Sequence, residues 1–368
     1  MRDSCLFSFR QWRAAAFVFL LTVTSLPNPA AADRPADPDA SANTITLLKY
    51  LTALPHQSTS TGHSLISGQW VGMGSLNNDE IQYIGTITSQ LPGLVGADYC
   101  ERRSGITPGN VNPSMIDYWN KGTLVDIDIL MPNPLTGGSC FENRTPLTPK
   151  QYAEVITPGM AAHKAYMANL ELVAAGLQEL QAAGVVVLFR PLREMDGNWN
   201  WYNGSPADFK TLWIQTFNYL TNKKGLHNLL WVFSTATDGG LNYYPGSQYV
   251  DIVGYDTYGY GNGKTPAAYN TLLKTGKPYA LTEFGLQGPS MPGTYPAYDL
   301  NTAISNIKNF MPEAVYFMNW SSGWQDTTQV GPKNYWAIDA QINAAAALNR
   351  HLIQNRPVPW NVPSPASP

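Results

Sequence analysis

The chain has 368 residues, of which 13% are charged, with 23 basic and 26 acidic side chains and a formal charge of −3. This weak negative charge excludes the basic surface on which nucleic-acid binding depends, so no nucleic-acid partner is expected. With 11 Trp and 20 Tyr, the composition instead suits an extracellular protein that handles a neutral polymer.

The first 32 residues have the pattern of a secretory signal peptide. Arginines precede the apolar run of residues 14–23, and Ala30–Ala32 supply a small-residue cleavage site. We expect a cut after Ala32 and a secreted or periplasmic protein. A signal anchor is the alternative, but the run is short for a membrane span, and no later stretch is apolar enough for one. Cleavage changes the formal charge from −3 to −5, because three arginines and Asp3 leave.

The remaining chain divides into one domain and two short flanks. Residues 33–43 are rich in Pro, Ala and Asp and are expected to form a flexible lead-in, while residues 356–368 form a Pro-rich tail. Between them, residues 44–355 show no break in composition, no linker and no repeat. That length is typical of a single elaborated barrel domain, and a monomer is expected.

Short apolar runs alternate with longer amphipathic ones through this domain. Helical patterns over 78–90, 160–183, 209–222 and 340–352 separate several of the runs. Eight strand–helix repeats predict an α/β fold, the (β/α)8 TIM barrel. A doubly wound open sheet gives the same alternation, but the count of eight and the lack of a G-x-G-x-x-G after any strand favour the barrel. The expected strands cover residues 65–69, 94–98, 124–130, 185–192, 229–234, 252–256, 279–282 and 314–319.

Polar and aromatic residues gather where these strands end. In a barrel all the carboxyl ends meet at one rim, so their side chains converge on one cavity. Glu194 follows the fourth strand and Glu283 the seventh, and two carboxylates across a cleft can hydrolyse a glycoside, one as proton donor and one as nucleophile. A separation of about 5–5.5 Å predicts retention of configuration, and about 6.5–9.5 Å predicts inversion. The other rim candidates are Gln69, Trp70, Asp98, Tyr99, residues 130–133, Ser234, Thr235, Asp256, Tyr258, Asn319 and Trp320.

The segment from Val185 to Tyr202 is the strongest of these signals. A buried strand ends in charge at Glu194, and charge at such a position is costly unless it is paired or used. Trp199 and Trp201 follow, and their flat faces suit stacking on sugar rings. The alternative is a structural ion pair between Arg190 and Glu194 beside core tryptophans.

Other chemistries find less support at these strand ends. Asp126 and Asp128 share one face of the third strand, but they lack a third ligand and a nearby histidine. We interpret them as buried acids bonded to neighbouring strands, or as one acid contacting Arg190. Ser234 and Thr235 have no partnered histidine, which argues against a serine-hydrolase triad. We therefore expect no metal and no cofactor.

The cysteines predict one disulfide. Cys5 leaves with the signal peptide, so Cys100 and Cys140 remain in an oxidising compartment. A bond between them would join the loops after the second and third strands. Two free buried thiols are the alternative.

A resemblance to a known family rests on the segment Arg190-Pro-Leu-Arg-Glu-Met-Asp-Gly-Asn-Trp-Asn-Trp-Tyr202. It resembles the R-P-F-H-E-M-N-G-x-W-x-W-W segment of glycoside hydrolase family 26, the family of secreted β-mannanases. Shorter stretches that also resemble the family follow in the same order along the predicted barrel, at residues 68–69, 131–134, 249–258, 282–285 and 317–320. The resemblance implies a retaining barrel hydrolase acting on β-1,4-mannan or a related polysaccharide.

The resemblance also implies a role for individual residues. Carried over position by position, it makes Glu194 the acid/base and Glu283 the nucleophile. Tyr258 matches a tyrosine that hydrogen-bonds the nucleophile, and Trp199 and Trp320 match tryptophans that line sugar subsites. The other residues expected to bind substrate are Arg190, Arg193, Trp201, Asp98, Tyr99, Gln69 and Asp256.

Two positions depart from the family pattern. Arg193 and Leu130 stand where the family has histidines that help to bind the sugar, and none of the five histidines of this chain lies at a strand end. Neither residue reproduces the donor and acceptor pair of a neutral imidazole. Three alternatives therefore stay open: another β-glycan (xylan, mixed-linkage glucan or a bacterial exopolysaccharide), an anionic substrate paired by Arg193 with Arg102 or Arg103, and a carbohydrate-binding barrel with impaired catalysis.

The position of Arg193 directly before Glu194 also leads to an expectation about which acid its guanidinium contacts. A guanidinium beside Glu194 would lower the pKa of a carboxyl that must hold its proton. We therefore expect another acid to hold Arg193 away from Glu194, with Asp98, Asp128 and Glu283 as the candidates. Pairing with Glu283 would also favour the ionised form of the nucleophile.

Overall fold

The computed structural model describes residues 34–57, 63–101, 104–140, 142, 144–258, 265–285, 299–320 and 342–361. Eight parallel strands close into a barrel in the order β1-β3-β6-β7-β8-β9-β10-β11, and β11 pairs back onto β1. The predicted (β/α)8 barrel is confirmed. Its strands are β1 (Leu65–Met73), β3 (Leu94–Asp98), β6 (Leu124–Ile129), β7 (Val187–Pro191), β8 (Leu229–Thr235), β9 (Ile252–Tyr258), β10 (Tyr279–Gly285) and β11 (Ala314–Asn319).

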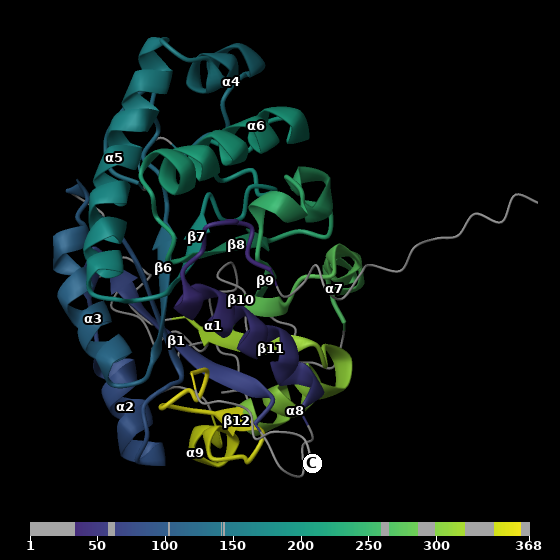
Figure 1. The fold of residues 1–368 in the computed structure, drawn as a ribbon. Helices are drawn as coiled ribbons and strands as arrows, with labels where there is room; N and C mark the ends of the chain where they lie inside the picture. The colour runs from purple at the N-terminus through teal and green to yellow at the C-terminus, as the bar shows by residue number, and fades with distance from the viewer. Residues whose placement is uncertain are drawn as a thin grey trace, which may run out of the picture.

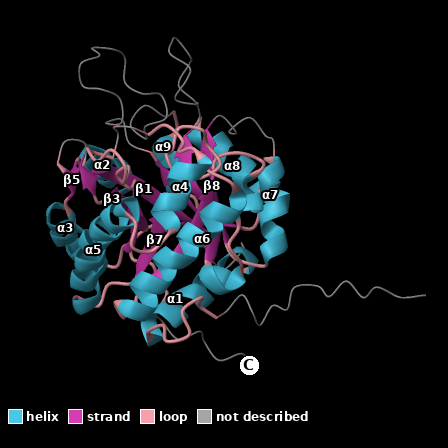
Figure 2. Cartoon of the chain, turned by 90° about the horizontal axis from the view of Figure 1, so that it is seen from above, coloured by secondary structure: helices cyan, strands magenta, loops and turns pink. Residues whose placement is uncertain are grey.

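Helices surround the strands on the outside of the barrel, as Figures 1 and 2 show. None of the described helices is long and apolar enough to cross a membrane. The sequence patterns predicted α2, α5, α6 and a longer form of α9, and they missed the other five. The helices are α1 (Ala42–Ala53), α2 (Asp79–Thr88), α3 (Asn112–Asn120), α4 (Pro149–Ile156), α5 (Ala161–Ala182), α6 (Pro206–Phe217), α7 (Ala267–Leu272), α8 (Leu300–Phe310) and α9 (Ala344–Leu348).

Four short strands lie outside the barrel ladder. β2 (Ser75–Leu76) forms a hairpin with β1, and β12 (Ile353–Gln354) runs parallel to β1. β4 (Cys100–Glu101) and β5 (Gly105–Ile106) form a separate antiparallel pair just after β3.

The barrel strands divide their side chains between two layers. In β6, Val125 and Ile127 pack outward against the helices, while Asp126 and Asp128 alternate with them and face the lumen. Most inner apolar residues, such as Leu124, come from the first part of their strand, while Trp70, Met318 and Trp320 extend the same cluster to the carboxyl ends of β1 and β11. The polar side chains of the lumen, such as Asp128, lie near the carboxyl ends of the strands.

Helix α1 closes the amino end of the barrel. Leu47, Leu48, Leu51 and Leu54 are fully buried and belong to the same apolar cluster as the lumen residues. Figure 1 shows α1 lying across the ring of strands, and Figure 2 shows it at one end of them. The carboxyl ends of the strands are left to form the site.

The described part of the predicted flexible lead-in, from residue 34 on, is packed against the barrel. Asp37 is 2% exposed and pairs with His227 Nδ1 at 2.8 Å. The backbone N–H of Ala36 donates to Asp251 Oδ1 at 2.5 Å. The expectation of flexibility is corrected here, because a polar, Pro-rich composition does not reveal partners that lie far away in the sequence.

The first part of the Pro-rich tail also packs on the barrel. Trp360 lies against Trp119, with ring centroids 5.3 Å apart. The predicted signal peptide over residues 1–32 and the tail after residue 361 lie outside the described residues.

Candidate active site

Glu283 reaches the lumen through an irregularity in β10. Leu281 and Phe284 are three residues apart, yet both pack in the outer, helix-facing core. The pairing of β10 with β9 shifts register between Ala280 and Glu283. An extra residue in a strand re-aims the side chains that follow it. Thr282 and Glu283 therefore both face inward, and Thr282 Oγ1 donates to the lumen carboxylate of Asp256 at 2.7 Å.

Glu194 lies on a turn with an unusual backbone. β7 ends at Pro191, and Leu192 and Glu194 then adopt φ angles of 50° and 55°. A residue other than glycine in this left-handed region costs on the order of 1–3 kcal/mol, and such residues cluster at functional sites. The N–H of Glu194 donates to the carbonyl of Ser234 at 3.0 Å, which ties the turn to the end of β8.

The structure brings the two predicted catalytic glutamates together. Carboxylate oxygens of Glu194, Asp256 and Glu283 all lie within 4.8 Å of one another. This spacing is close to the range of about 5–5.5 Å for retaining sites and well below that for inverting ones. A trio of carboxylates could also attract a cation, but arginine side chains already bond two of the three.

Three donors hold the carboxylate of Glu283. The hydroxyl of Tyr258 donates to Oε2 at 2.7 Å. Arg190 Nη2 donates to Oε1 at 3.0 Å, and Arg193 Nη1 donates to the same oxygen. Charge-assisted bonds of this kind are short and directional. Glu283 is thus fixed in orientation with both of its oxygens bonded.

Arg190, on β7, binds carboxylates from three other barrel strands, β6, β9 and β10. Its Nε and Nη2 each donate to Asp128 at 2.6 Å, and its Nη1 donates to Asp256 Oδ1 at 3.1 Å. The β6–β7 register places Arg190 directly opposite Asp128. The interpretation of Asp128 as a buried acid contacting Arg190 matches this arrangement. The alternative ion pair of Arg190 with Glu194 is wrong, since the ion pairs of Arg190 are with Asp128, Asp256 and Glu283.

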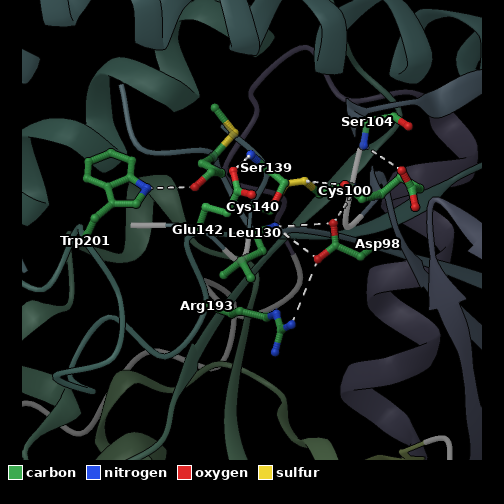
Figure 3. The surroundings of a disulfide bond; sticks show 11 residues. Asp98, Cys100, Ser104, Leu130, Ser139, Cys140, Glu142, Arg193 and Trp201 are labelled. Carbon is green, nitrogen blue, oxygen red and sulfur yellow. Dashed lines mark hydrogen bonds and ion pairs between the residues drawn. A yellow bond between two sulfur atoms is a disulfide. The ribbon is translucent and has the colours of Figure 1, made fainter. Parts of the chain in front are cut away.

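Arg193 lies between Glu283 and Asp98, as expected for a cation held by another acid. Its Nη2 is 4.0 Å from Asp98 Oδ2, a contact drawn in Figure 3. The guanidinium carbon lies 5.1 Å from the ring centroid of Trp320. Arg193 is 5% exposed. Its charge is paired with Glu283 and Asp98, and its guanidinium lies over the ring of Trp320.

Asp98 links Arg193 to the disulfide. Its Oδ1 accepts from the N–H of Cys100 at 2.7 Å, and its Oδ2 accepts from the N–H of Leu130 at 3.1 Å. Burial raises the pKa of Asp98 to about 7, although Arg193 opposes the rise. The predicted disulfide between Cys100 and Cys140 is confirmed, with Cα atoms 6.1 Å apart. Figure 3 shows the bond next to Asp98 and Leu130.

The environment of Glu194 favours its protonated form. Burial raises the pKa of its carboxyl, and the charge of Glu283 raises it further. Arg193 and a hydrogen bond from Trp199 Nε1 to Oε2, at 2.8 Å, act in the opposite direction without reversing the shift. Two neighbouring carboxyls in different environments, one with a raised pKa and one bonded to two arginines, are what acid and nucleophile roles require.

The tryptophans predicted to contact sugar differ in their exposure to solvent. Trp199 is 42% exposed and offers an open ring at the rim. Trp201 is buried, and its Nε1 donates to the carbonyl of Met131 at 2.7 Å. Trp320 is also buried and stacks on Trp70 with centroids 4.1 Å apart. Of the predicted tryptophans, Trp199 alone thus offers an open ring, while the contact of Trp201 and Trp320 with a sugar stays a prediction.

Two further predicted residues also lie away from any open surface. Tyr99 is fully buried in the outer core, where its hydroxyl donates to Asn112 at 2.7 Å. Gln69 is fully buried, and its Nε2 donates to the carbonyl of Trp70 at 2.9 Å. Both side chains are already bonded within the protein, and their contact with substrate stays a prediction. A strand end predicts proximity to the rim, but it does not predict which side of the barrel wall a side chain takes.

Sequence reasoning missed the polar side chains that hold the turn carrying Glu194. Asn200 Nδ2 donates to the carbonyls of Arg193 and Glu194, and the hydroxyl of Tyr202 also donates to that of Arg193. Arg144 Nη2 donates to Asn200 Oδ1 at 2.8 Å. A polar residue between two tryptophans was the one available signal for Asn200. Nothing in the sequence connects it to Arg144.

Comparisons with known proteins give a consistent result. A family model described as Glycosyl hydrolase family 26 matches residues 36–343. A mannan endo-1,4-beta-mannosidase of Bacillus subtilis (strain 168) is 32% identical over 355 residues, which cover 90% of this chain and 94% of that protein. Mannan endo-1,4-beta-mannosidase A and B of Caldalkalibacillus mannanilyticus is 29% identical, covering 94% of this chain and 71% of that protein. A solved structure of a Bacillus subtilis mannanase superposes with a TM-score of 0.77 at 30% identity, covering 90% and 97% of the two chains.

Proposed function

The chain belongs to glycosyl hydrolase family 26 and is a glycoside hydrolase acting on O-glycosyl bonds, and we propose that it is a retaining endo-β-1,4-mannanase. The observation that carries the proposal is the pair formed by Glu194 and Glu283, whose carboxylate oxygens lie within 4.8 Å. Relatives named as mannan endo-1,4-beta-mannosidases, of which the alignments cover 94% and 71%, support the choice of polymer.

The first chemical step breaks the glycosidic bond. Glu194 gives its proton to the glycosidic oxygen, while Glu283 attacks the anomeric carbon and forms a covalent glycosyl–enzyme. The aglycone part of the chain leaves as an alcohol. Glu194, now ionised, then takes a proton from water, and the hydroxide oxygen displaces Glu283. Two inversions give a product with the original configuration.

The charges around the pair support this division of roles. Arg190, Arg193 and Tyr258 direct hydrogen bonds to Glu283, which fix the orientation of the nucleophile. Burial raises the pKa of Glu194, which favours an acid that still carries its proton near neutral pH.

The site favours a neutral sugar over an anionic one. Arg193 bonds Glu283 and lies near Asp98, so its charge is already balanced by protein carboxylates. An anionic substituent would have to compete with these acids for the guanidinium. The exposed ring of Trp199 instead offers an apolar face of the kind a pyranose ring stacks against.

The proposal extends to where and in what form the protein acts. An N-terminal segment with a signal-peptide pattern supports secretion or a periplasmic location, where a polymeric substrate is accessible. We propose a monomer that needs no metal and no cofactor, since two carboxyl groups are sufficient for the reaction.

Product analysis on a panel of polysaccharides tests the proposal. Mannan is expected to give internal cleavage products, and proton NMR of the first product is expected to show the β-anomer before mutarotation. Preference for xylan or a mixed-linkage glucan would reassign the polymer. Tight binding of mannan with no new reducing ends would support a carbohydrate-binding barrel instead.

A further inference from the structure

The backbone that carries Glu194 is held by side chains outside the reacting pair. Leu192 and Glu194 both have positive φ angles, a conformation that residues with a Cβ adopt only when the surroundings impose it. Something must therefore fix the turn between β7 and the tryptophan-bearing loop. The hydrogen bonds to its carbonyl groups identify what does so.

Asn200 is the centre of this arrangement. It is 1% exposed, and its Nδ2 donates to the carbonyl of Arg193 at 3.2 Å and to that of Glu194 at 3.0 Å. One amide group thus spans two consecutive carbonyls, which lie on either side of the Cα of Glu194. The hydroxyl of Tyr202 adds a second bond to the carbonyl of Arg193 at 2.8 Å.

Arg144 fixes which way the amide of Asn200 points. Its Nη2 donates to Asn200 Oδ1 at 2.8 Å. Because a guanidinium has donors only, it must face the amide oxygen, so Nδ2 is directed at the two carbonyls. Without Arg144 the amide could rotate and present its oxygen to them, which would repel them.

The disulfide anchors the segment from which Arg144 comes. Cys140 lies four residues before Arg144 and is bonded to Cys100, directly after β3. Figure 3 shows this bond beside Asp98, which contacts Arg193. The disulfide thereby attaches the loop after β6 to the segment that follows β3, at a point four residues before Arg144 in the sequence.

We propose that Arg144 and Asn200 are positioning residues for the acid/base, acting through the backbone of residues 193–194 rather than on the substrate. This inference rests on the proposed function. Its consequence is selective: a misplaced acid impairs protonation of a poor leaving group, whereas attack by Glu283 on a substrate with a good leaving group needs no such proton.

Two substitutions of Asn200 separate its contacts. Asn200→Asp keeps the shape and an acceptor for Arg144, but it replaces the donor to the carbonyls by an oxygen. Asn200→Ala removes both contacts. Arg144→Met leaves the amide in place without its orienting bond, and it serves if the Asn200 variants do not fold. Asn203→Ala is the matched control, because its amide donates to the carbonyl of Met195 at 2.8 Å in the same loop.

The test compares mannan with 2,4-dinitrophenyl β-mannobioside as substrates of the full mature chain. We expect Asn200→Asp and Arg144→Met to lower kcat/KM on mannan about 10–100-fold and on the aryl glycoside by less than about threefold, with Asn203→Ala close to the unchanged enzyme. The alkaline limb of the mannan profile should move to lower pH, because a loosened Glu194 gains water and its pKa falls.

The results that overturn the inference differ from those that overturn the function. Equal losses on both substrates, no loss in either variant, or the same loss in Asn203→Ala would contradict the positioning role. Failure of the unchanged enzyme to hydrolyse either substrate would instead contradict the proposed function.

Discussion

The guanidinium of Arg193 donates to Oε1 of Glu283, so the residue directly before one member of the catalytic pair is bonded to the other. Leu192, in a left-handed conformation, makes the turn through which Arg193 reaches the lumen. The arginine that stands where the resembled family pattern has a histidine is therefore bonded to the proposed nucleophile. Its charge still acts against the raised pKa of Glu194 without reversing it.

Arg193→His is expected to lower kcat at least about tenfold on both mannan and an activated aryl glycoside, because both reactions need an oriented nucleophile. Arg193→Lys should retain more activity, since it keeps the charge without the planar fork. Steady-state kinetics on the two substrates, with a thermal melt of each variant, measure this. A gain in mannan activity for Arg193→His would show that the arginine is a specificity change and not a support for Glu283.

Glu194→Ala separates proton donation from attack. We expect turnover of mannan to fall by about 10²–10⁴-fold, the usual contribution of a general acid. Cleavage of 2,4-dinitrophenyl β-mannobioside should be spared in its first step, because dinitrophenolate leaves without a proton, and a burst of dinitrophenol should precede slow deglycosylation. Stopped-flow absorbance detects the burst. Equal loss on both substrates without a burst would remove Glu194 from the acid role.

Trp199→Phe tests the electrostatic environment of Glu194. The indole N–H donates to Glu194 Oε2 at 2.8 Å, and this bond lowers the pKa of the carboxyl. Phenylalanine keeps an aromatic ring but has no donor, so the pKa should rise and Glu194 should keep its proton to higher pH. The alkaline limb of kcat/KM is therefore expected to move upward. Trp360→Phe, near the amino ends of the strands, should leave the limb unchanged, and a downward shift in Trp199→Phe would contradict this account.

The disulfide should contribute measurably to stability. Cys100 and Cys140 close a loop with a sequence separation of 40 residues. Cross-links of this length typically stabilise by about 2–4 kcal/mol, so in a domain of this size Cys100→Ser with Cys140→Ser should lower Tm by on the order of 3–6 °C. Calorimetry of the variant, and of the unchanged protein with and without reductant, measures the effect. An unchanged Tm after verified reduction would argue against a stabilising role.

The architecture was predictable because barrel strands leave a strong local signal. Runs such as Leu229–Thr235, buried throughout, read as strands from composition alone. The helix α7 (Ala267–Leu272) has six residues, too few for a helical period to repeat, and was missed. The packing of Asp37 on His227 was also missed, because it joins residues 190 positions apart and leaves no local pattern.

The residue types of the site could be predicted from the sequence, but most contacts between its side chains could not. Glu194 and Glu283 could be placed at the rim because both follow strands. The inward turn of Glu283 depends on a register shift in β10, and strict alternation along the strand gives no indication of it. Trp199 and Trp201 lie in turns, where no strand or helix period applies, so the sequence could not tell the exposed Trp199 from the buried Trp201.

Trapping of the glycosyl–enzyme tests the central claim most directly. A 2-deoxy-2-fluoro mannoside with a good leaving group slows the second step more than the first, so the covalent intermediate accumulates. Peptide mass spectrometry is then expected to find one sugar per chain, attached to Glu283. Attachment to Glu194 or to another residue, or turnover of the reagent with no trapped sugar and an α-anomeric product, would contradict the assignment of Glu283 as the nucleophile of a retaining pair.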